Sequence, residues 1–450
     1  MTTARPGLPS TDPPAPSHPA SPEDGDAVER ALAAVDDRRL IELCADLVDI
    51  GSPTGGERAL AVHLAERLRA AGLHGETQEV EGDLVNAHGT LRGTDDRAPS
   101  LLLYAPIDTV TTARPELDRP WAGPEPRPDM VPRAEVRNGV VIGLGAHNPK
   151  GHGACLLMVA EALTAAGVRP AETIHIGFGG GGMPANAWAA DLADGHGRGC
   201  AALVERLAPD AAVITKTGWS VSHEEVGLVW VTVEVAGTHT YVGSRHLLPY
   251  RNAIGDAAHL IQGLEAWFPR WAEDHRSGLV APQGVVAAVD GGWPHAAAFT
   301  TALCRVHLDL RVSPRTSCDE AVLAVETEVA RLAAEIGAEA TCRTTVAIEG
   351  TTTDPDHAVI GRCVQAWEAM EQRHHEPVAG LSGATDANIL RAAGVPTARI
   401  GLPKVSPSRI GGEVDFQLGM NAVDVDDLRR LTELLLRVVI AGPANQEGTA

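Results

Sequence analysis

The sequence predicts an α/β protein, built as a main α/β layered domain with a smaller α+β domain inserted in it. Apolar runs of strand length alternate with helical patterns through the first half of the chain, which is typical of a sheet covered by helices. Past Trp219, an alternating stretch at residues 227–237 begins a separate strand–helix–strand–helix unit. With 450 residues, the chain is long enough for two domains with their own cores.

The individual elements follow from hydrophobic periodicity. Apolar residues that recur every three or four positions predict helices, at residues 26–52, 57–71, 153–166, 252–268, 318–336, 355–371 and 425–440. Short apolar or alternating runs predict strands, at residues 77–84, 101–105, 140–143, 173–178, 227–237, 301–312 and 397–401.

Changes in composition and pattern set the expected domain boundaries. Residues 1–26 are rich in Pro, Ser, Thr and Ala and carry too little apolar surface to pack, so we expect a disordered tail. The main domain is expected at 27–220 and again at 343–442. The inserted domain is expected at 221–342, and a second tail at 443–450.

The charge balance and the cysteines limit the class of protein. The 59 Asp and Glu residues outnumber the 37 Lys and Arg residues, and the net charge of −22 argues against binding to nucleic acid. No apolar run reaches the length of a membrane span, and no basic-then-apolar signal segment opens the chain. Seven scattered cysteines without a Cys-x-x-Cys pattern fit a reducing compartment. We therefore expect a cytoplasmic protein with no nucleic-acid or membrane partner.

Two loops that follow predicted strands carry the strongest functional signals. The apolar run that starts at Leu101 changes at Pro106 to a polar tip with Asp108, as where a buried parallel strand brings a residue to the edge of a sheet. The second loop, residues 143–153, is a Gly-rich turn that contains Lys150 and opens an apolar helix. Both loops are therefore candidates for an active site.

The order of these loops resembles the di-zinc aminoacylase, carboxypeptidase G and succinyl-diaminopimelate desuccinylase family, which reads His-x-Asp-Thr-Val in the first and Asp-x-Lys-Gly in the second. Further motifs of that family stand at residues 251–254, 309–311 and 383–386. The resemblance covers nearly the whole folded chain. It implies a main domain with an inserted lid domain, a homodimer formed through the lid, and a pocket for a small amide that bears a carboxylate.

The chain departs from this family at the positions that hold its metal ions and its general base. The family has His, Asp, a Glu-Glu pair, a further acidic ligand and a last His; this chain has Pro106, Asn148, Gly182 with Met183, Lys216, and Phe416 or Gln417. A catalytic zinc ion needs about three N, O or S ligands and an open position for water. We therefore expect neither a bound metal nor another cofactor.

The candidate site residues combine retained family motifs with groups that could replace the metals. As catalytic residues, which would transfer protons or stabilise charge, we predict Asp108, His147, Lys150, Lys216, His239 and Tyr241. As substrate-binding residues we predict Asn148, Asn252, Arg311, Gly383, Thr385 and Asp386.

Each of the more informative candidates has an ordinary alternative. Lys216 is expected to form an ion pair with Asp108 that replaces the charge of the metal, or else to point to solvent. Arg311 is expected to bind a substrate carboxylate, or else to make a salt link within the lid. His147 could equally be a polar loop residue whose ring is satisfied by the backbone.

Three functions remain open at this point. The first is metal-independent chemistry on the C–N bond of a small amide, such as an N-acyl amino acid. The second is a catalytically inactive homologue that binds a small ligand or a partner. The third is a metal-dependent amidohydrolase with ligands recruited elsewhere, for example Asp108, His147 and His239. The first is the leading hypothesis, because many residues of the family's pocket are retained.

Overall fold

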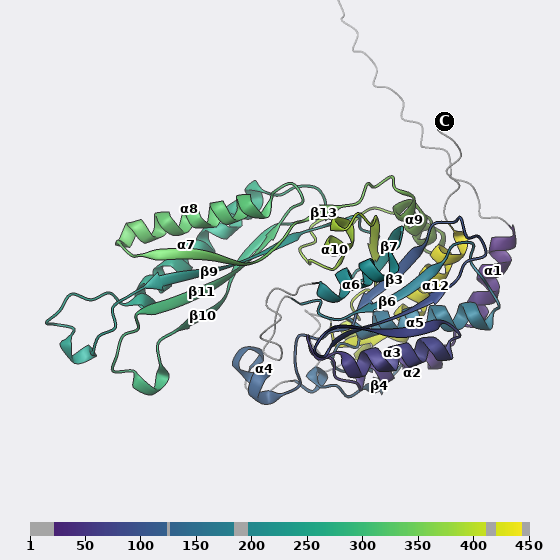
Figure 1. Cartoon of the computed structure of the whole chain (residues 1–450), viewed down its shortest axis with the longest axis horizontal. Helices are drawn as coiled ribbons and strands as arrows, with labels where there is room; N and C mark the ends of the chain where they lie inside the picture. Colours follow the sequence, from purple (N-terminus) through teal and green to yellow (C-terminus); the bar gives the residue numbers. More distant parts are fainter. Residues whose placement is uncertain (1–21, 124–126, 184–196, 411–419, 443–450) are drawn as a thin grey trace, which may run out of the picture.

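The computed structural model describes residues 22–123, 127–183, 197–410 and 420–442. The protein is α/β, with a main domain built on a mixed sheet and a lid domain that extends from it as an arm (Figure 1). The predicted fold class is therefore correct. None of the helices within the described ranges is long and apolar enough to cross a membrane.

A six-stranded sheet forms the centre of the main domain. In spatial order its strands are β1 (His74–Glu81), β2 (Leu84–Leu91), β6 (Ile174–Gly179), β3 (Leu101–Pro106), β7 (Ala211–Thr215) and β14 (Thr397–Ile400). The last four run parallel to one another, and β2 pairs antiparallel with both β1 and β6. Because parallel strands end at one edge, the loops after β3, β6, β7 and β14 meet there.

Helices cover both faces of this sheet. The larger core lies on the side of α1 (Pro22–Ala33), α2 (Asp37–Val48), α3 (Arg58–Ala70), α5 (Lys150–Ala165), α9 (Ala358–Glu371) and α12 (Val425–Ala441). The opposite face packs on α6 (Arg198–Leu207) and α10 (Ala387–Ala392). Three short strands, β4 (Glu135–Arg137), β5 (Val140–Ile142) and β15 (Ala422–Asp424), form a separate small sheet. The short helices α4 (Pro115–Ala122) and α11 (Pro407–Ile410) lie in connections.

The lid is a four-stranded antiparallel sheet with two helices. Its strands are, in spatial order, β10 (Gln283–Gly291), β11 (Leu303–Val312), β9 (Gly227–Ala236) and β12 (Ala340–Ile348). The helices α7 (Ala253–Asp274) and α8 (Cys318–Ile336) pack on it and share a core with the inward side chains of β9 and β11. A two-stranded sheet, β8 (Glu224–Glu225) with β13 (Thr351–Thr352), joins the lid to the main domain.

Several details differ from the sequence-based expectations. Strand β12 runs to Ile348, past the boundary expected at 342. The expected helix over 26–52 is two helices, because Asp36 caps the start of α2. Strands β10 and β12 were not predicted, since many of their side chains are exposed and carry a weak apolar pattern. The terminal tails lie outside the described residues.

Candidate active site

Asp108 stands directly after β3, at the edge where the parallel strands end. Its Oδ2 accepts a hydrogen bond from the hydroxyl of Thr54 at 2.7 Å and one from the backbone N–H of Met183 at 3.0 Å. Its Oδ1 faces Gly182, where an added Cβ would lie only 2.7 Å away. A glycine is therefore required beside this carboxylate.

Glu57 is a site residue that the sequence did not reveal. It is fully buried, and its Oε1 accepts hydrogen bonds from the backbone N–H groups of Gly55 and Gly181, both at 2.9 Å. No hydrogen-bond partner reaches its buried Oε2 from the described residues. Burial, and then the negative charge of Asp108, raise the pKa of Glu57 to about 8. The only signal in the sequence was an acidic side chain at the start of a helix, which is common for other reasons.

Lys216 follows β7 at the same edge and is half-buried. Burial lowers the pKa of its amine, whereas the charges of Asp108 and Asp386 act to raise it. The structure describes both side chains, and Lys216 and Asp108 form no ion pair within 4.0 Å. The expected direct pair is thus not formed, although the ammonium lies within the electrostatic field of both carboxyl groups.

Asp386 is buried beside the same edge, in the turn that precedes α10. Its Oδ2 accepts a hydrogen bond of 2.5 Å from the hydroxyl of Tyr104 on β3, and its Oδ1 has no partner among the described residues. Burial raises the pKa of Asp386 to about 6. In the same turn, the hydroxyl of Thr385 accepts a hydrogen bond from the backbone N–H of Ala387, and Gly383 borders open space. Of the three predicted residues in this turn, Asp386 is the one with a buried side-chain atom that has no partner among the described residues.

The two histidines of the Gly-rich turn hold the loop after β14. His147 Nε2 lies 2.9 Å from the carbonyl oxygen of Pro403, and His152 Nε2 accepts a hydrogen bond of 3.2 Å from the backbone N–H of Leu402. Burial lowers the pKa of His147 to about 4 and that of His152 well below its usual value, so both rings are neutral at pH 7. Their Nδ1 atoms and the Oδ1 of Asn148 are buried without partners in the described ranges.

Lys150 occupies a different environment from the one expected. Its ammonium donates hydrogen bonds to the carbonyl oxygens of Ile50 at 2.6 Å and Val48 at 3.4 Å, which end α2. Burial lowers the pKa of its amine to about 7. The predicted proton-transfer role is therefore corrected to a structural one: the amine satisfies carbonyl groups that the helix leaves unpaired.

The predicted lid residues are used within the lid. Asn252 caps the start of α7 through a bond from the N–H of Ile254, and Arg311 makes two hydrogen bonds to Asp309, at 2.7 and 2.8 Å. The alternative salt link is thus formed in place of a free carboxylate anchor. The connection between β9 and α7, which contains His239 and Tyr241, lies at the free end of the arm (Figure 1). Both contact Phe299 there, and the structure does not bring them to Asp108.

The described residues do not fit a di-metal site. No group of three or more His, Cys, Asp or Glu side chains in the described ranges is placed to hold a metal ion. His147 is turned to the backbone of Pro403 and His239 to that of Thr300, so neither joins Asp108. The position expected for the last family ligand, Phe416 or Gln417, lies outside the described residues.

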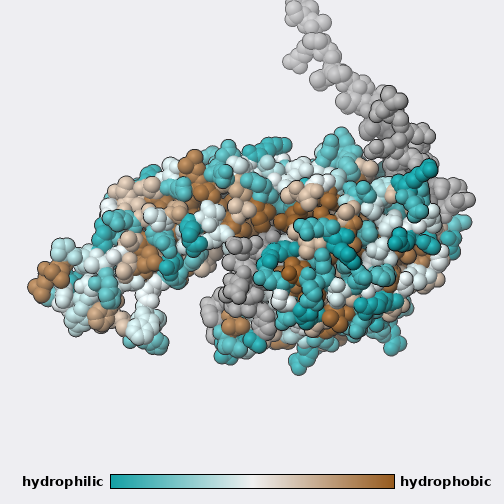
Figure 2. Space-filling model, viewed as in Figure 1, coloured by the Kyte–Doolittle hydropathy of each residue, from teal (hydrophilic) through white to brown (hydrophobic). Residues whose placement is uncertain are grey.

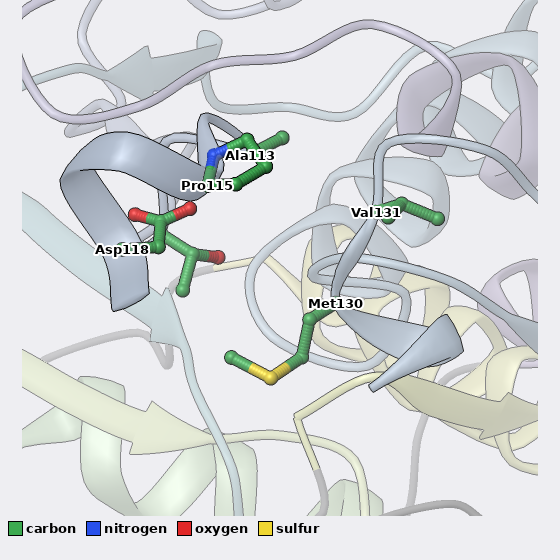
Figure 3. Close-up of a pocket in the computed structure, with 6 residues that line it drawn as sticks. Ala113, Pro115, Asp118, Met130 and Val131 are labelled. Carbon is green, nitrogen blue, oxygen red and sulfur yellow. The ribbon is translucent and has the colours of Figure 1, made fainter. Parts of the chain in front are cut away.

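A small cavity of about 50 Å³ lies to one side of these groups (Figure 3). Ala113, Pro115 and Asp118 border it from the α4 side, and Met130 and Val131 face them. The carboxylate of Asp118 already accepts two hydrogen bonds from Thr112, so the cavity offers little free polar chemistry. Its volume suits a few water molecules rather than an amide substrate.

Comparison with known proteins identifies the class. Residues 102–441 match the model of Peptidase family M20/M25/M40. The chain therefore belongs to that family.

Solved structures of very different sequence share the fold. The dipeptidase Dug1p from Saccharomyces cerevisiae is 11% identical with a TM-score of 0.68, and the alignment covers 92% of this chain and 98% of that one. Human carnosine dipeptidase 1 is 13% identical with a TM-score of 0.67, covering 94% and 99%. The YXEP protein of Bacillus subtilis, described as a dinuclear metal binding peptidase, is 13% identical with a TM-score of 0.57, covering 90% and 97%.

Proposed function

We propose that this chain acts on the C–N bond of a small, carboxylate-bearing amide, such as an N-acyl amino acid, without the two metal ions of its family. The family and the fold support peptidase or amidase chemistry. The observation that carries the metal-independent form is the donor set at the sheet edge. It offers carboxyl groups and an amine on Asp108, Glu57, Asp386 and Lys216, in place of a cluster of metal ligands.

These groups can do acid–base chemistry near neutral pH. A general acid or base is most effective when its pKa lies near the working pH. Glu57, with a pKa of about 8, and Asp386, with a pKa of about 6, bracket that range. Lys216 adds an amine whose pKa is lowered by burial. A site of this kind can move protons to and from an amide, but supplies no Lewis acid.

A catalytically inactive, ligand-binding homologue is the second candidate. It is favoured by one observation: Lys150, Asn252 and Arg311, retained from the family motifs, all serve local structure. Retained motifs of this kind would persist in a chain that no longer turns over substrate.

The test combines metal analysis with an activity screen on the purified full-length chain. We expect less than one equivalent of zinc, cobalt or manganese per chain, and hydrolysis of some N-acetyl amino acids or dipeptides in excess chelator. Two tightly bound metals per chain would overturn the metal-independent form. A metal-poor protein that binds such amides and leaves them intact would favour the inactive homologue.

We further propose a cytoplasmic homodimer joined through the lid. Apolar side chains are exposed in the connections that follow β9 and β10, namely Tyr241, Leu247, Leu248, Trp293 and Phe299. Figure 2 shows a small hydrophobic spot at the free end of the lid. Exposed apolar clusters of this kind are typical of contact surfaces. In sedimentation, a wild-type dimer that Leu247→Glu converts to monomers would support the proposal, whereas a monomeric wild type would exclude it.

A further inference from the structure

Glu57 and Asp108 are held in matching ways by the same two segments. Each carboxyl group has one oxygen that accepts two hydrogen bonds. One donor comes from the loop before α3, Gly55 N–H or the Thr54 hydroxyl. The other comes from the run after β6, the N–H of Gly181 or Met183. In both groups, the second oxygen receives no hydrogen bond from the described residues.

The Gly-rich run after β6 has the shape that this pair requires. A Cβ at Gly180 would lie 3.1 Å from the carboxyl carbon of Glu57, and one at Gly182 would lie 2.7 Å from Oδ1 of Asp108. A side chain at Gly182 would force the carboxylate of Asp108 to shift, and one at Gly180 would be in tight contact with the carboxyl group of Glu57. The glycines therefore let a backbone run pass close to both acids and donate to them, and the run is more than a remnant of a lost site.

The two carboxyl groups cannot both carry a charge at low energy. Glu57 is buried and Asp108 is nearly so, and two like charges that share a buried region repel each other strongly. Burial and the charge of Asp108 raise the pKa of Glu57 to about 8. At neutral pH Glu57 therefore keeps its proton.

We propose that Glu57 and Asp108 bind the hydrolytic water molecule between their two free oxygens and are the acid–base pair of a metal-independent amide hydrolysis. This inference rests on the proposed function. A buried carboxylic acid without a partner costs free energy unless something occupies its hydrogen-bonding position. A water that accepts from Oε2–H of Glu57 and donates to Oδ1 of Asp108 would satisfy both groups.

The reaction balances with water and the amide alone. The water oxygen forms a bond to the carbonyl carbon, and its proton moves to Asp108. The C–N bond then breaks, its electron pair goes to nitrogen, and Asp108 returns the proton to that nitrogen. Glu57 keeps its proton and holds the water oxygen in place. The products are a carboxylic acid and an amine, and the pair is regenerated.

The first arm of the test measures the pair directly. The infrared C=O band of protonated Glu57, assigned from its absence in Glu57→Gln, should disappear around pH 8 in the wild type. Asp108→Asn removes the neighbouring charge and should lower this midpoint by about one unit or more. Asp118→Asn, which changes a buried carboxylate outside the pair, should leave the midpoint unchanged. An unchanged midpoint in Asp108→Asn would overturn the proposal even if the wild type hydrolyses amides.

The second arm measures hydrolysis of N-acetyl amino acids in excess chelator. Asp108→Asn should lose about 100-fold or more in kcat, since general acid–base groups contribute roughly that much. Glu57→Gln keeps a hydrogen-bond donor that cannot ionise, so it should retain part of the rate and lose the fall in rate above pH 8. Glu57→Leu should lose both, and Thr54→Val should lose part of the rate while remaining folded.

The two arms separate the two possible failures. If the midpoint shifts as expected but the wild type hydrolyses no amide, the proposed function fails and the pair is a structural one. If amides are hydrolysed and Glu57→Gln keeps the fall in rate above pH 8, the function stands and the role of Glu57 is overturned.

Discussion

The lid and the edge of the main sheet treat their polar residues in opposite ways. In the lid, Arg311 makes two hydrogen bonds to Asp309, which also accepts one from the indole of Trp230, and Asn252 caps a helix. At the sheet edge, buried polar atoms without a partner in the described ranges belong to Glu57, His147, Asn148, His152 and Asp386. The motif residues of the lid are thus hydrogen-bonded to one another or to the backbone, whereas the sheet edge gathers buried polar atoms that have no partner among the described residues.

This difference indicates where function is concentrated. Leaving a buried polar group unpaired costs about 1 to 3 kcal/mol, so a fold accumulates such groups only where something else stabilises or uses them. The lid motifs resemble those of the family in sequence, yet their contacts give them a structural role within the lid. The sheet edge lacks the family's pattern of metal ligands, yet several of its buried polar atoms have no partner among the described residues and are available for catalysis.

The largest expected effect comes from a buried ion pair between the regions. Arg399 and Glu225 are both buried and lie 3.0 Å apart, so Arg399→Met would leave an uncompensated charge and should cost about 3 to 5 kcal/mol of unfolding free energy. Arg305→Met, which breaks an exposed pair with Glu234, is the matched control and should cost much less. Urea unfolding measures both. Equal losses would show that burial does not govern these pairs.

The next effect is the pH dependence that Lys150 produces. Its pKa is lowered to about 7 in the folded protein, so between pH 7 and about 10 the unfolded state binds more protons. Unfolding free energy attributable to Lys150 should therefore rise with pH in this window, by at most about 1.4 kcal/mol per unit. Lys150→Met should remove that slope, whereas Lys404→Met, at an exposed position, should retain it. A slope that survives in Lys150→Met would contradict the assignment.

A smaller effect is expected from the lid. Asn252→Ala removes the side chain that caps α7 and should cost about 1 kcal/mol, whereas Asn252→Asp should keep the cap and the stability. Thermal unfolding followed by circular dichroism measures the loss. If Asn252→Ala leaves stability unchanged but abolishes ligand binding, the substrate-binding role predicted from the sequence would be restored.

The smallest effect is the coupling between Lys216 and Asp108. Because no direct ion pair joins them, a double-mutant cycle of Lys216→Met and Asp108→Asn should give an interaction free energy below about 1 kcal/mol. A coupling of several kcal/mol would indicate the direct ion pair that the sequence suggested. Polar residues at the sheet edge would then be paired, as those of the lid are.

Much of the fold could be predicted from the sequence, because periodicity is local information. The helix expected at 318–336 has those bounds in α8, and the strand expected at 101–105, before Asp108, is β3. The expected parallel strands also indicated that functional loops lie at one edge of the sheet. Residues 227–237 and 301–312 located the two central strands of the lid, whereas the more exposed β10 was missed.

The site was predicted less completely, because its chemistry depends on contacts between distant segments. Glu57 had no distinctive spacing, and its role follows from the approach of Gly181 across the fold. Lys150 was retained from a family motif, but its amine binds a carbonyl group at the C-terminal end of α2. The carboxyl groups beside the glycines after β6 explain why that run lacks side chains, and this closeness could not be seen in the sequence.

The base of the lid is joined to the main domain by backbone hydrogen bonds. Thr351 and Thr352 pair with Glu225 and Glu224, so the chain leaves the main domain and returns to it side by side. A few residues further on, Gly227 and Gly350 are in close contact: a Cβ on Gly227 would lie 2.4 Å from the backbone nitrogen of Gly350. No residue of the lid contributes to the cores of the main sheet. The lid is also joined to the main domain at a second place, where the N–H of Ala281 and the carbonyl oxygen of Leu279 pair with Leu381 and Gly380. The arm is therefore held to the main domain by hydrogen bonds at two places, without sharing the cores of the domain that carries the carboxyl pair.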